Sequence, residues 1–439
     1  ERLLRQVNRV YQKNNDLLMS SGLYKTLADA GLLIAHEEAA MDLACTGEAY
    51  KVIQPRQVPF ISYPYEWCFS QLKDAALLTL HIQQVALDHG MSLKDASAYN
   101  VQFLEGRPVF IDTLSFEECR EGKPWVAYRQ FCQHFLAPLA LASYRDIRLS
   151  QLLRIHADGV PLDLASALLP WRTKLRMHLL AHIHLHAGAQ KRYAERQVET
   201  RGRRMGRMSL LGLVDNLKTA VQKLDWSPGG TPWADYYQDT NYTPRALQDK
   251  EQLVSRFLDQ VRPTSVWDFG ANIGLFSRLA SQRGIPTLSL DADPAAVERN
   301  YRSCVASKEK NILPLLLDLT NPSAGLGWNS SERIPFLERG RADAALVLAL
   351  VHHLAIANNL PLGRIAGFFR SLCRHLIIEF VPKSDSQVQR LLRTREDIFP
   401  EYAQEKFEQE FAAYFRIVRR EGMRDSERVL YLMEGSSSV

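Results

Sequence analysis

The sequence has no long apolar run, no clustered cysteines and no strong excess of charge of one sign. No stretch approaches the roughly 20 apolar residues that a membrane-spanning helix needs, and the first ten residues are charged rather than signal-like. The 6 cysteines are scattered without a CxxC pair, which is typical of a reduced cytoplasmic protein. A formal net charge of +5 over 439 residues is too small to argue by itself for nucleic-acid binding. These absences predict a cytoplasmic protein with no membrane span.

The length of the chain indicates two or three domains, because 439 residues exceed one ordinary hydrophobic core. The segment 226–232, WSPGGTP, interrupts any periodic element with two glycines and two prolines. We therefore predict a mainly helical N-terminal domain over 1–225, ending in a basic linker, and a second domain over 226–439. In the first of these, apolar spacing predicts helices over residues 1–50, 71–90 and 125–190, and two short β-rich runs joined by the turn at Gly106 and Arg107 predict a hairpin at 100–115.

The second domain shows alternating helix and strand patterns. Short apolar runs predict strands at 265–269, 287–290, 312–317, 344–350 and 376–380, and amphipathic segments predict helices at 247–261, 274–283, 294–307 and 361–374. This alternation predicts an α/β fold with a doubly wound, mostly parallel sheet. The chain closes with two β-rich runs, FRIVRREGM and RVLYLME, around the polar turn RDSE. We expect these two runs to form a terminal antiparallel hairpin at the sheet edge.

The first strand of this domain leads into a glycine turn, VWDFGANIG at 266–274. Gly270 and Gly274 free the backbone to take positive φ and to approach a ligand closely, and the following helix N-terminus offers unpaired N–H groups. The second strand ends in Asp291, 23 residues after Asp268. This is near the spacing at which a second-strand acid meets ribose hydroxyls in dinucleotide folds. The pattern therefore predicts a site for a nucleotide-like ligand.

These features, together with an acid that closes the third strand and with the terminal hairpin, resemble the class I S-adenosylmethionine-dependent methyltransferases. The resemblance covers about residues 233–439 and implies a Rossmann-like fold with S-adenosylmethionine as the cofactor. A nicotinamide dehydrogenase is the nearest rival. However, GANIG is not GxGxxG, and a dehydrogenase would lack the antiparallel hairpin.

The resemblance also implies a set of cofactor-binding residues: Asp268, Gly270, Asn272, Gly274, Asp291, Asp318 and Leu319. The turn 270–274 would contact the methionyl portion, with Asp268 near its ammonium group. Asp291 would accept hydrogen bonds from both ribose hydroxyls, and Asp318 with the backbone of Leu319 would meet the adenine edge. Aromatic residues ahead of the fold would cap the site: Trp233, Tyr236, Tyr237 and Tyr242.

Candidate catalytic residues follow the fourth and fifth strands. Methyl transfer depends mainly on placing the acceptor, and a base is needed only where the acceptor atom is protonated. His352 and His353 emerge at the carboxyl edge of the sheet, and histidine accepts a proton near neutral pH. We expect one of the two to face the substrate, while the other packs against the cofactor loop. Glu379 could orient or deprotonate an acceptor, or pair with an arginine.

The sequence indicates the methyl acceptor less closely than it indicates the cofactor. The fourth strand is followed by LALV rather than by an NPPY-like motif, which disfavours methylation of adenine or glutamine nitrogen and favours oxygen or carbon of a small molecule or glycan. RNA or protein is the alternative acceptor, because seven basic residues lie between Lys191 and Arg207. A solvated helix end or linker is the favoured interpretation of that basic segment. The segment 382–411 is expected to be helical and to shape the acceptor pocket.

A second motif lies in the first domain. Asp95 stands five residues before Asn100, and a short strand then ends in Asp112, which resembles the catalytic loop and metal-binding strand of protein and aminoglycoside kinases. The resemblance implies that Asp95 accepts a hydroxyl proton and that Asn100 and Asp112 bind Mg²⁺.

This kinase-like pattern is incomplete. Leu93 and Lys94 replace the usual histidine and arginine, Thr113 and Leu114 replace the end of DFG, and no glycine-rich loop followed by a strand lysine precedes Tyr63. The alternatives are an ATP-binding or interaction domain of kinase type coupled to the second domain, or an unrelated helical domain in which Asp95 and Asn100 cap turns.

Three histidines, His178, His182 and His186, share one face of a predicted helix. This spacing permits divalent metal binding, but neither a cysteine nor a carboxylate completes a ligand set nearby. We therefore interpret this segment as a helix lined with polar histidines and predict no metal site.

Overall fold

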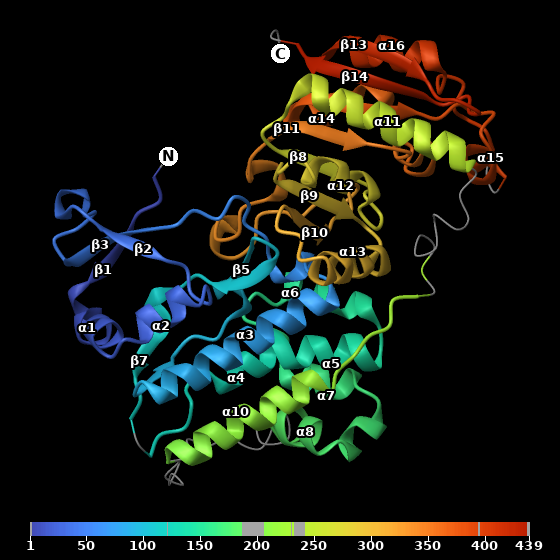
Figure 1. The fold of residues 1–439 in the computed structure, drawn as a ribbon. Helices are drawn as coiled ribbons and strands as arrows, with labels where there is room; N and C mark the ends of the chain where they lie inside the picture. The colour runs from blue at the N-terminus through green and yellow to red at the C-terminus, as the bar shows by residue number, and fades with distance from the viewer. Residues whose placement is uncertain are drawn as a thin grey trace. The chain divides into compact units, whose positions relative to one another are not determined.

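The computed structural model describes residues 2–120, 122–186, 206–229, 231, 242–393 and 396–436. The chain divides into two compact units, Glu1–Ser227 and Pro228–Val439, whose elements are labelled in Figure 1. Within the described ranges, no helix is both long enough and apolar enough to cross a membrane.

The second unit contains a seven-stranded sheet with the order β10-β9-β8-β11-β12-β14-β13. Its strands are β8 (Val266–Phe269), β9 (Thr287–Asp291), β10 (Ile312–Leu316), β11 (Ala342–Val347), β12 (Cys373–Phe380), β13 (Phe415–Gly422) and β14 (Val429–Gly435). The first five in sequence pair in parallel, and β14 pairs antiparallel with both β12 and β13. The predicted doubly wound sheet with a terminal antiparallel hairpin is therefore confirmed.

Helices cover both faces of this sheet (Figure 1). They are α11 (Pro244–Val261), α12 (Leu275–Ser281), α13 (Pro294–Ala306), α14 (Leu362–Leu372), α15 (Ser386–Leu392) and α16 (Gln404–Ala412). Val266 of β8 shares a buried cluster with Phe257 of α11 and Phe276 of α12. Phe269 of the same strand packs on Phe369 of α14 instead, with ring centroids 5.5 Å apart. Residues three apart on a strand point to opposite faces, so α11 and α14 lie on opposite sides of the sheet.

The sheet has a switch point beside β8. From β8 the chain goes outward through β9 and β10 on one side, and later returns to place β11 and β12 on the other. In such sheets the connecting loops diverge at the carboxyl ends of the two central strands and leave a crevice that binds ligands. The ends of β8 and β11 are therefore where the fold positions a site.

The first unit begins with a small antiparallel sheet of order β1-β3-β2. It contains β1 (Arg5–Asn8), β2 (His36–Ala39) and β3 (Ala49–Pro55), with α1 (Gln12–Ser20) and α2 (Leu23–Asp29) between the first two. The expectation of helices throughout residues 1–50 was thus wrong outside α1 and α2. Two of these strands have only four residues, which is too short for alternation to stand out from the helical spacing around them.

The helix α3 (Phe69–Asp88) forms the buried centre of the first unit and stops before Gly90, which has φ +72°. Four short strands follow, namely β4 (Met91–Leu93), β5 (Val101–Leu104), β6 (Arg107–Phe110) and β7 (Phe116–Glu118). β4 pairs antiparallel with β7, and β5 with β6. The other α-helices in the described part of this unit are α4 (Tyr128–Phe131), α5 (Ala137–Tyr144), α6 (Leu152–Ile155), α7 (Leu162–Leu168), α8 (Met177–Leu179) and α10 (Arg207–Gln222).

Candidate active site

A cavity of about 310 Å³ lies at the carboxyl ends of the central strands of the second unit. Six of the seven residues that the sequence assigned to the cofactor line it: Asp268, Gly270, Asn272, Asp291, Asp318 and Leu319. His353, Tyr242 and Lys250 line it too. The cavity occupies the switch point of the sheet, where the fold places a ligand crevice.

The glycine turn forms one wall of this cavity. Gly270 has φ +71°, and its N–H donates to the carbonyl of Leu290 at 2.8 Å. Asn272 also has a positive φ of 51°, and its N–H donates to Asp291 Oδ2 at 2.7 Å. Gly274 does not belong to the lining. Gly274 has a positive φ of 77°, and a Cβ there would lie 2.5 Å from Asn300 Oδ1, so both the backbone conformation and close packing against α13 favour glycine at this position.

Two acids stand beside the turn, of which Asp268 is buried and Asp291 is partly exposed. Asp268 is 2% exposed and accepts a hydrogen bond from Ser277 Oγ at 2.6 Å. Burial raises the pKa of Asp268 to about 7, and it raises that of Asp291 to about 6 although Asn272 and Asp293 donate backbone hydrogen bonds to the latter. Ionising both acids is therefore costly in the free chain. A ligand that brings an ammonium group and hydroxyls would offset this cost.

The third-strand acid is held differently. Asp318 is exposed, and its Oδ1 accepts from the N–H of Thr320 at 2.8 Å and from the hydroxyl of Thr320 at 2.6 Å. These contacts fix the loop after β10, so that Leu317, Leu319 and Thr320 also line the cavity.

The adjacent histidines differ in their positions. His353 lines the cavity, whereas His352 does not and is 2% exposed. Their ring centroids lie 4.2 Å apart. Burial lowers the pKa of His353 to about 4, with a further contribution from Arg428, and it lowers that of His352 well below its ordinary value. Both rings are therefore neutral at physiological pH.

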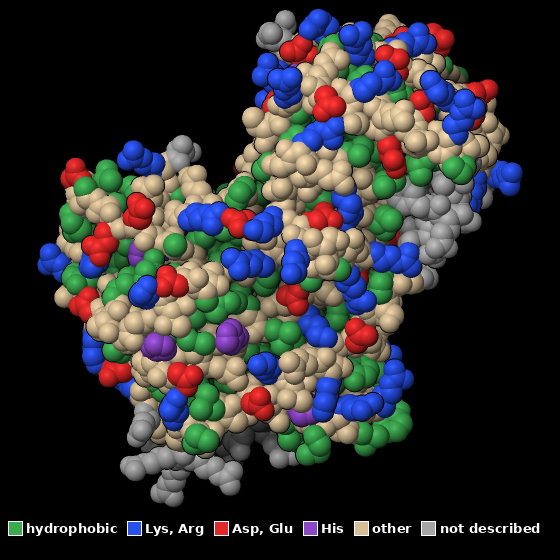
Figure 2. All heavy atoms as spheres, in the orientation of Figure 1, with side chains coloured by type: hydrophobic (Ala, Val, Ile, Leu, Met, Phe, Trp, Pro, Cys, Tyr) green, Lys and Arg blue, Asp and Glu red, His purple; other side chains and the backbone are tan. Residues whose placement is uncertain are grey.

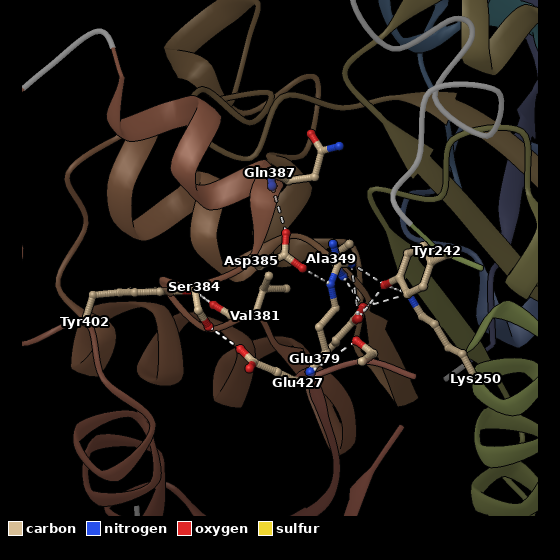
Figure 3. A network of polar contacts seen from close by, with 12 residues as sticks. Tyr242, Lys250, Ala349, Glu379, Val381, Ser384, Asp385, Gln387, Tyr402 and Glu427 are labelled. Carbon is tan, nitrogen blue, oxygen red and sulfur yellow. Dashed lines mark hydrogen bonds and ion pairs between the residues drawn. The ribbon is translucent and has the colours of Figure 1, made fainter. Parts of the chain in front are cut away.

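A buried ionic network adjoins the cavity, and Figure 3 shows how its side chains converge. Glu379, at the end of β12, is completely buried. Its Oε2 accepts from Lys250 Nζ at 2.6 Å and from the N–H of Ala349 at 2.7 Å, and its Oε1 accepts from the Tyr242 hydroxyl at 2.5 Å. Ala349 has φ +50°, so the carboxylate fixes a strained backbone turn directly after β11.

Arg428 supplies the second cation of the network. It is 1% exposed, lies 3.5 Å from Glu379 Oε1, donates to the Tyr242 hydroxyl and contacts Asp385 Oδ2 through Nε at 2.7 Å. Burial by itself would raise the pKa of Glu379, but Lys250 and Arg428 hold it below its ordinary value. Glu379 therefore stays ionised at neutral pH.

Sequence reasoning missed Lys250 and Arg428. Lys250 carried a signal, because it stands at helical spacing within the apolar stripe of Leu247, Val254 and Phe257 on α11, where a lysine is anomalous. Arg428 carried no such sequence signal. It borders the polar turn of the hairpin, and its burial depends on elements far away in the sequence.

A second cavity, of about 490 Å³, shares Tyr242 with the first. The segment after β12 and the β13–β14 turn form most of its wall: Ser384, Asp385, Ser386, Asp425, Ser426, Glu427 and Arg428. Hydroxyl and carboxyl groups thus predominate in its lining.

The other predicted residues lie elsewhere or outside the described ranges. Trp233, Tyr236 and Tyr237 fall outside them, as does the basic segment apart from Arg207, which pairs with Asp88. His182 and His178 hydrogen-bond to Asn216, and Tyr128 contacts His182 Nδ1 at 2.7 Å. These contacts build the helical packing of the first unit.

Taken together, the strand order, the closing hairpin and the acids at three strand ends give the second unit the fold of the class I S-adenosylmethionine-dependent methyltransferases. The chain is 38% identical over 420 residues to nodulation protein NoeA of Rhizobium meliloti (strain 1021), a match that covers 94% of this chain and 88% of that protein. The chain therefore belongs to the NoeA family. No family model matches it.

Two solved structures are similar to a little under half of this chain, at low sequence identity. Magnesium protoporphyrin IX methyltransferase (ChlM) from Synechocystis PCC 6803 with bound SAH is 18% identical over 46% of this chain and 93% of that chain, with a TM-score of 0.33. N-methyltransferase NodS from Bradyrhizobium japonicum WM9 is 14% identical over 44% of this chain and 98% of that chain, with a TM-score of 0.33.

Proposed function

We propose that this chain transfers a methyl group from S-adenosylmethionine to an oxygen or carbon atom of a small molecule or glycan. The observation that carries this proposal is the pair of cavities that share Tyr242. The first has the acids and the glycine turn that suit the cofactor, and the second offers hydrogen-bonding groups to a polar acceptor.

The residues of the first cavity fit the cofactor group by group. Asp268 is buried and costly to ionise, so it suits the ammonium of the methionyl portion. Asp291 suits the ribose hydroxyls, and Asp318 with the backbone of Leu319 suits the adenine edge. The cofactor would supply an activated methyl group on a sulfonium. The protein would hold it and exclude water.

The second cavity favours a polyhydroxylated acceptor without negative charge. Ser384, Ser386 and Ser426 present hydroxyls, while Asp425 and Glu427 add carboxylates that accept hydrogen bonds from sugar hydroxyls. The charge of Arg428 is already engaged by Glu379 and Asp385. A phosphate backbone would meet the carboxylates of Asp425 and Glu427 at this rim, which is unfavourable.

The surface also gives no support to a nucleic-acid acceptor over the part that is described. Figure 2 shows lysine and arginine side chains interspersed with aspartate and glutamate over the visible face. Proteins that bind nucleic acid usually gather their basic residues into a patch or stripe.

His353 is the residue that we assign to proton transfer. It lines the cofactor cavity and is neutral at physiological pH, so its ring can accept the proton that a hydroxyl acceptor loses. Glu379 positions Tyr242, Lys250 and the turn at Ala349 through the hydrogen bonds described above.

Titration calorimetry with S-adenosylmethionine, followed by transfer of a labelled methyl group to neutral oligosaccharides, RNA and protein in parallel, tests the proposal. Asp291→Ala should lower cofactor affinity at least about tenfold, because hydrogen bonds to a charged group are lost. Asp259→Asn is the matched control, since Asp259 pairs with Arg283 on the surface. The proposal fails if folded protein shows no binding, or if only RNA or protein accepts the methyl group.

A further inference from the structure

The acids of the kinase-like motif in the first unit are occupied by local contacts. Asp95 Oδ1 accepts from the N–H of Ser97 at 2.9 Å. Asp112 Oδ1 accepts from the N–H of Leu114 at 2.9 Å, and Arg5 Nη1 lies 2.5 Å from the same oxygen. Both carboxylates therefore hold turns. The unassigned feature of this unit lies on another part of its surface.

A short exposed segment combines large apolar and basic side chains. Residues 171–177 run from a short 3₁₀ helix, Trp171–Leu175, into α8. Trp171, Leu175 and Met177 are 74%, 72% and 73% exposed. The basic residues of the segment are exposed as well: Arg172, Lys174 and Arg176. Surfaces commonly expose large apolar side chains singly, whereas several so close together mark an interaction surface.

A buried residue anchors this segment. Thr173 is completely buried, and its hydroxyl donates to the carbonyl of Pro170 at 2.6 Å and contacts His184 Nε2 at 2.9 Å. On its other side, His184 Nδ1 lies 2.8 Å from Ser166 Oγ. The N–H of Arg176 donates to the carbonyl of Thr173 at 3.1 Å. These hydrogen bonds hold the backbone, so an ordered turn presents the apolar side chains to solvent.

The charge around the segment has one sign. The sequence contains no aspartate or glutamate from 164 to 194. Lys223 follows the last residue of α10, and its Nζ lies 3.2 Å from Nε2 of His178, the residue after Met177. An anionic surface would therefore meet cations and no like charge along this stretch of chain.

This combination of side chains suits the surface of an anionic bilayer. Tryptophan prefers the headgroup level of a membrane, aliphatic side chains enter the acyl boundary, and lysine and arginine attract anionic headgroups. RNA would use the cations and can stack on Trp171, but it offers no apolar partner to Leu175 and Met177. A protein partner would have to desolvate the cations at the centre of the contact, where interfaces are depleted of charge.

We propose that residues 171–177 attach the first unit to anionic lipid bilayers. Trp171, Leu175 and Met177 insert at the boundary between headgroups and acyl chains, and the basic side chains contact the headgroup phosphates. The attachment is peripheral. It concerns the first unit alone and does not depend on the methyl acceptor of the second.

Vesicle flotation with the full chain tests the proposal. Vesicles of phosphatidylglycerol and phosphatidylcholine should carry the protein upward, vesicles of phosphatidylcholine alone should carry far less, and high salt should weaken the binding. Trp171→Ala should lower the partition coefficient about tenfold, because the ring no longer leaves water on binding. Each charge variant should lower it about fivefold: Arg172→Gln, Lys174→Gln and Arg176→Gln.

Matched controls replace the same residue types elsewhere. Trp328→Ala removes a tryptophan of the second unit that is 83% exposed, and Arg148→Gln removes an arginine of the first unit that pairs with Asp146. Both variants should bind vesicles like the unmodified chain. All the replaced side chains are exposed, so the thermal unfolding midpoint should stay the same, which separates lost binding from lost folding.

Quenching of tryptophan fluorescence by brominated lipids distinguishes insertion from adsorption. The unmodified chain should be quenched, and Trp171→Phe should lose most of this quenching while it still binds vesicles. The proposal is overturned if anionic vesicles do not bind the chain, if Trp171→Ala and Trp328→Ala weaken binding equally, or if Trp171→Phe leaves the quenching unchanged. Binding of RNA through this segment in place of vesicles would also overturn it.

Discussion

The hydroxyl of Tyr242 lies 2.5 Å from Glu379 Oε1, although the two residues are 137 positions apart in the chain. Tyr242 lines both cavities of the second unit, and Glu379 is completely buried behind it. The carboxylate therefore fixes the one side chain among the described residues that the cofactor cavity and the proposed acceptor cavity share.

Tyr242→Phe should affect turnover more than cofactor binding. The substitution keeps the ring but removes the hydroxyl that contacts Glu379, Lys250 and Arg428. We expect kcat to fall about tenfold, while the dissociation constant of S-adenosylmethionine changes by less than about threefold. Calorimetry and steady-state kinetics measure the two effects. An unchanged kcat would contradict the role of Tyr242 between the cavities.

Glu379→Ala should destabilise the second unit strongly. It leaves Lys250 and Arg428 buried, with one carboxylate fewer to compensate them, at an expected cost of about 3–5 kcal/mol in the free energy of unfolding. Denaturant unfolding measures this loss. The exposed Lys25–Asp29 pair gives a control, because Lys25→Ala removes an ion pair that solvent screens and should leave the free energy of unfolding almost unchanged. Equal losses in the two variants would show that the buried network is not a stabilising element.

Cofactor affinity should rise with pH between about 6 and 8. Burial raises the pKa of Asp268 to about 7 in the free chain, and binding an ammonium group requires the ionised form. Calorimetry across this range should show tighter binding at high pH, and Asp268→Asn should remove both the affinity and most of its pH dependence. A pH-independent affinity would contradict the assignment of Asp268 to the ammonium group.

Asp268 should also make the stability of the free chain depend on pH, with stability falling as pH rises while cofactor affinity increases. Its folded-state pKa of about 7 exceeds the ordinary value of 3.8, so its contribution to stability is fully present below pH 3.8 and is lost as pH rises through 7. Free Asp268→Asn protein should therefore lose less stability than the unmodified chain between pH 4 and 8. Thermal unfolding at several pH values measures this difference. If the stability of the two proteins changes in parallel with pH, Asp268 does not have the raised pKa.

Gly274→Ala should cost more stability than Gly284→Ala. Both glycines have a positive φ, of 77° and 75°, so the backbone penalty of about 1 kcal/mol is shared. Only at Gly274 would the new Cβ meet Asn300, at 2.5 Å, whereas Gly284 has nothing within 4 Å. We expect an additional loss of about 1–3 kcal/mol for Gly274→Ala in denaturant unfolding. Equal losses would show that Asn300 moves away freely.

His353→Ala should lower kcat by about 10²-fold or more, and His352→Ala by much less, if His353 accepts the proton. Because burial lowers the pKa of His353 to about 4, its acidic limb in the kcat profile should lie near pH 4. A limb near pH 6.5 that disappears in His353→Ala would contradict the buried, neutral state of this ring.

Local sequence determined the second unit almost completely. The first three strands of this unit are short apolar runs, and each leads into a glycine turn or an acid, so pattern alone placed Asp268, Asp291 and Asp318 at one edge of the sheet. The polar turn between two β-rich runs likewise predicted the closing hairpin. These features depend on neighbours in the chain, which is why the sequence reveals them.

Only the tertiary structure decided the other features of the site, because those features depend on contacts between segments that are distant in the sequence. Only the fold shows that Lys250 and Arg428 converge on Glu379, that His353 rather than His352 reaches the cavity, and that Gly274 is fixed by Asn300. In the first unit, the spacing from Asp95 to Asn100 was visible in the sequence. The approach of Arg5 to Asp112 was not visible. Arg5 lies on the four-residue strand β1 and reaches Asp112 only when the small sheet folds against the β5–β6 hairpin.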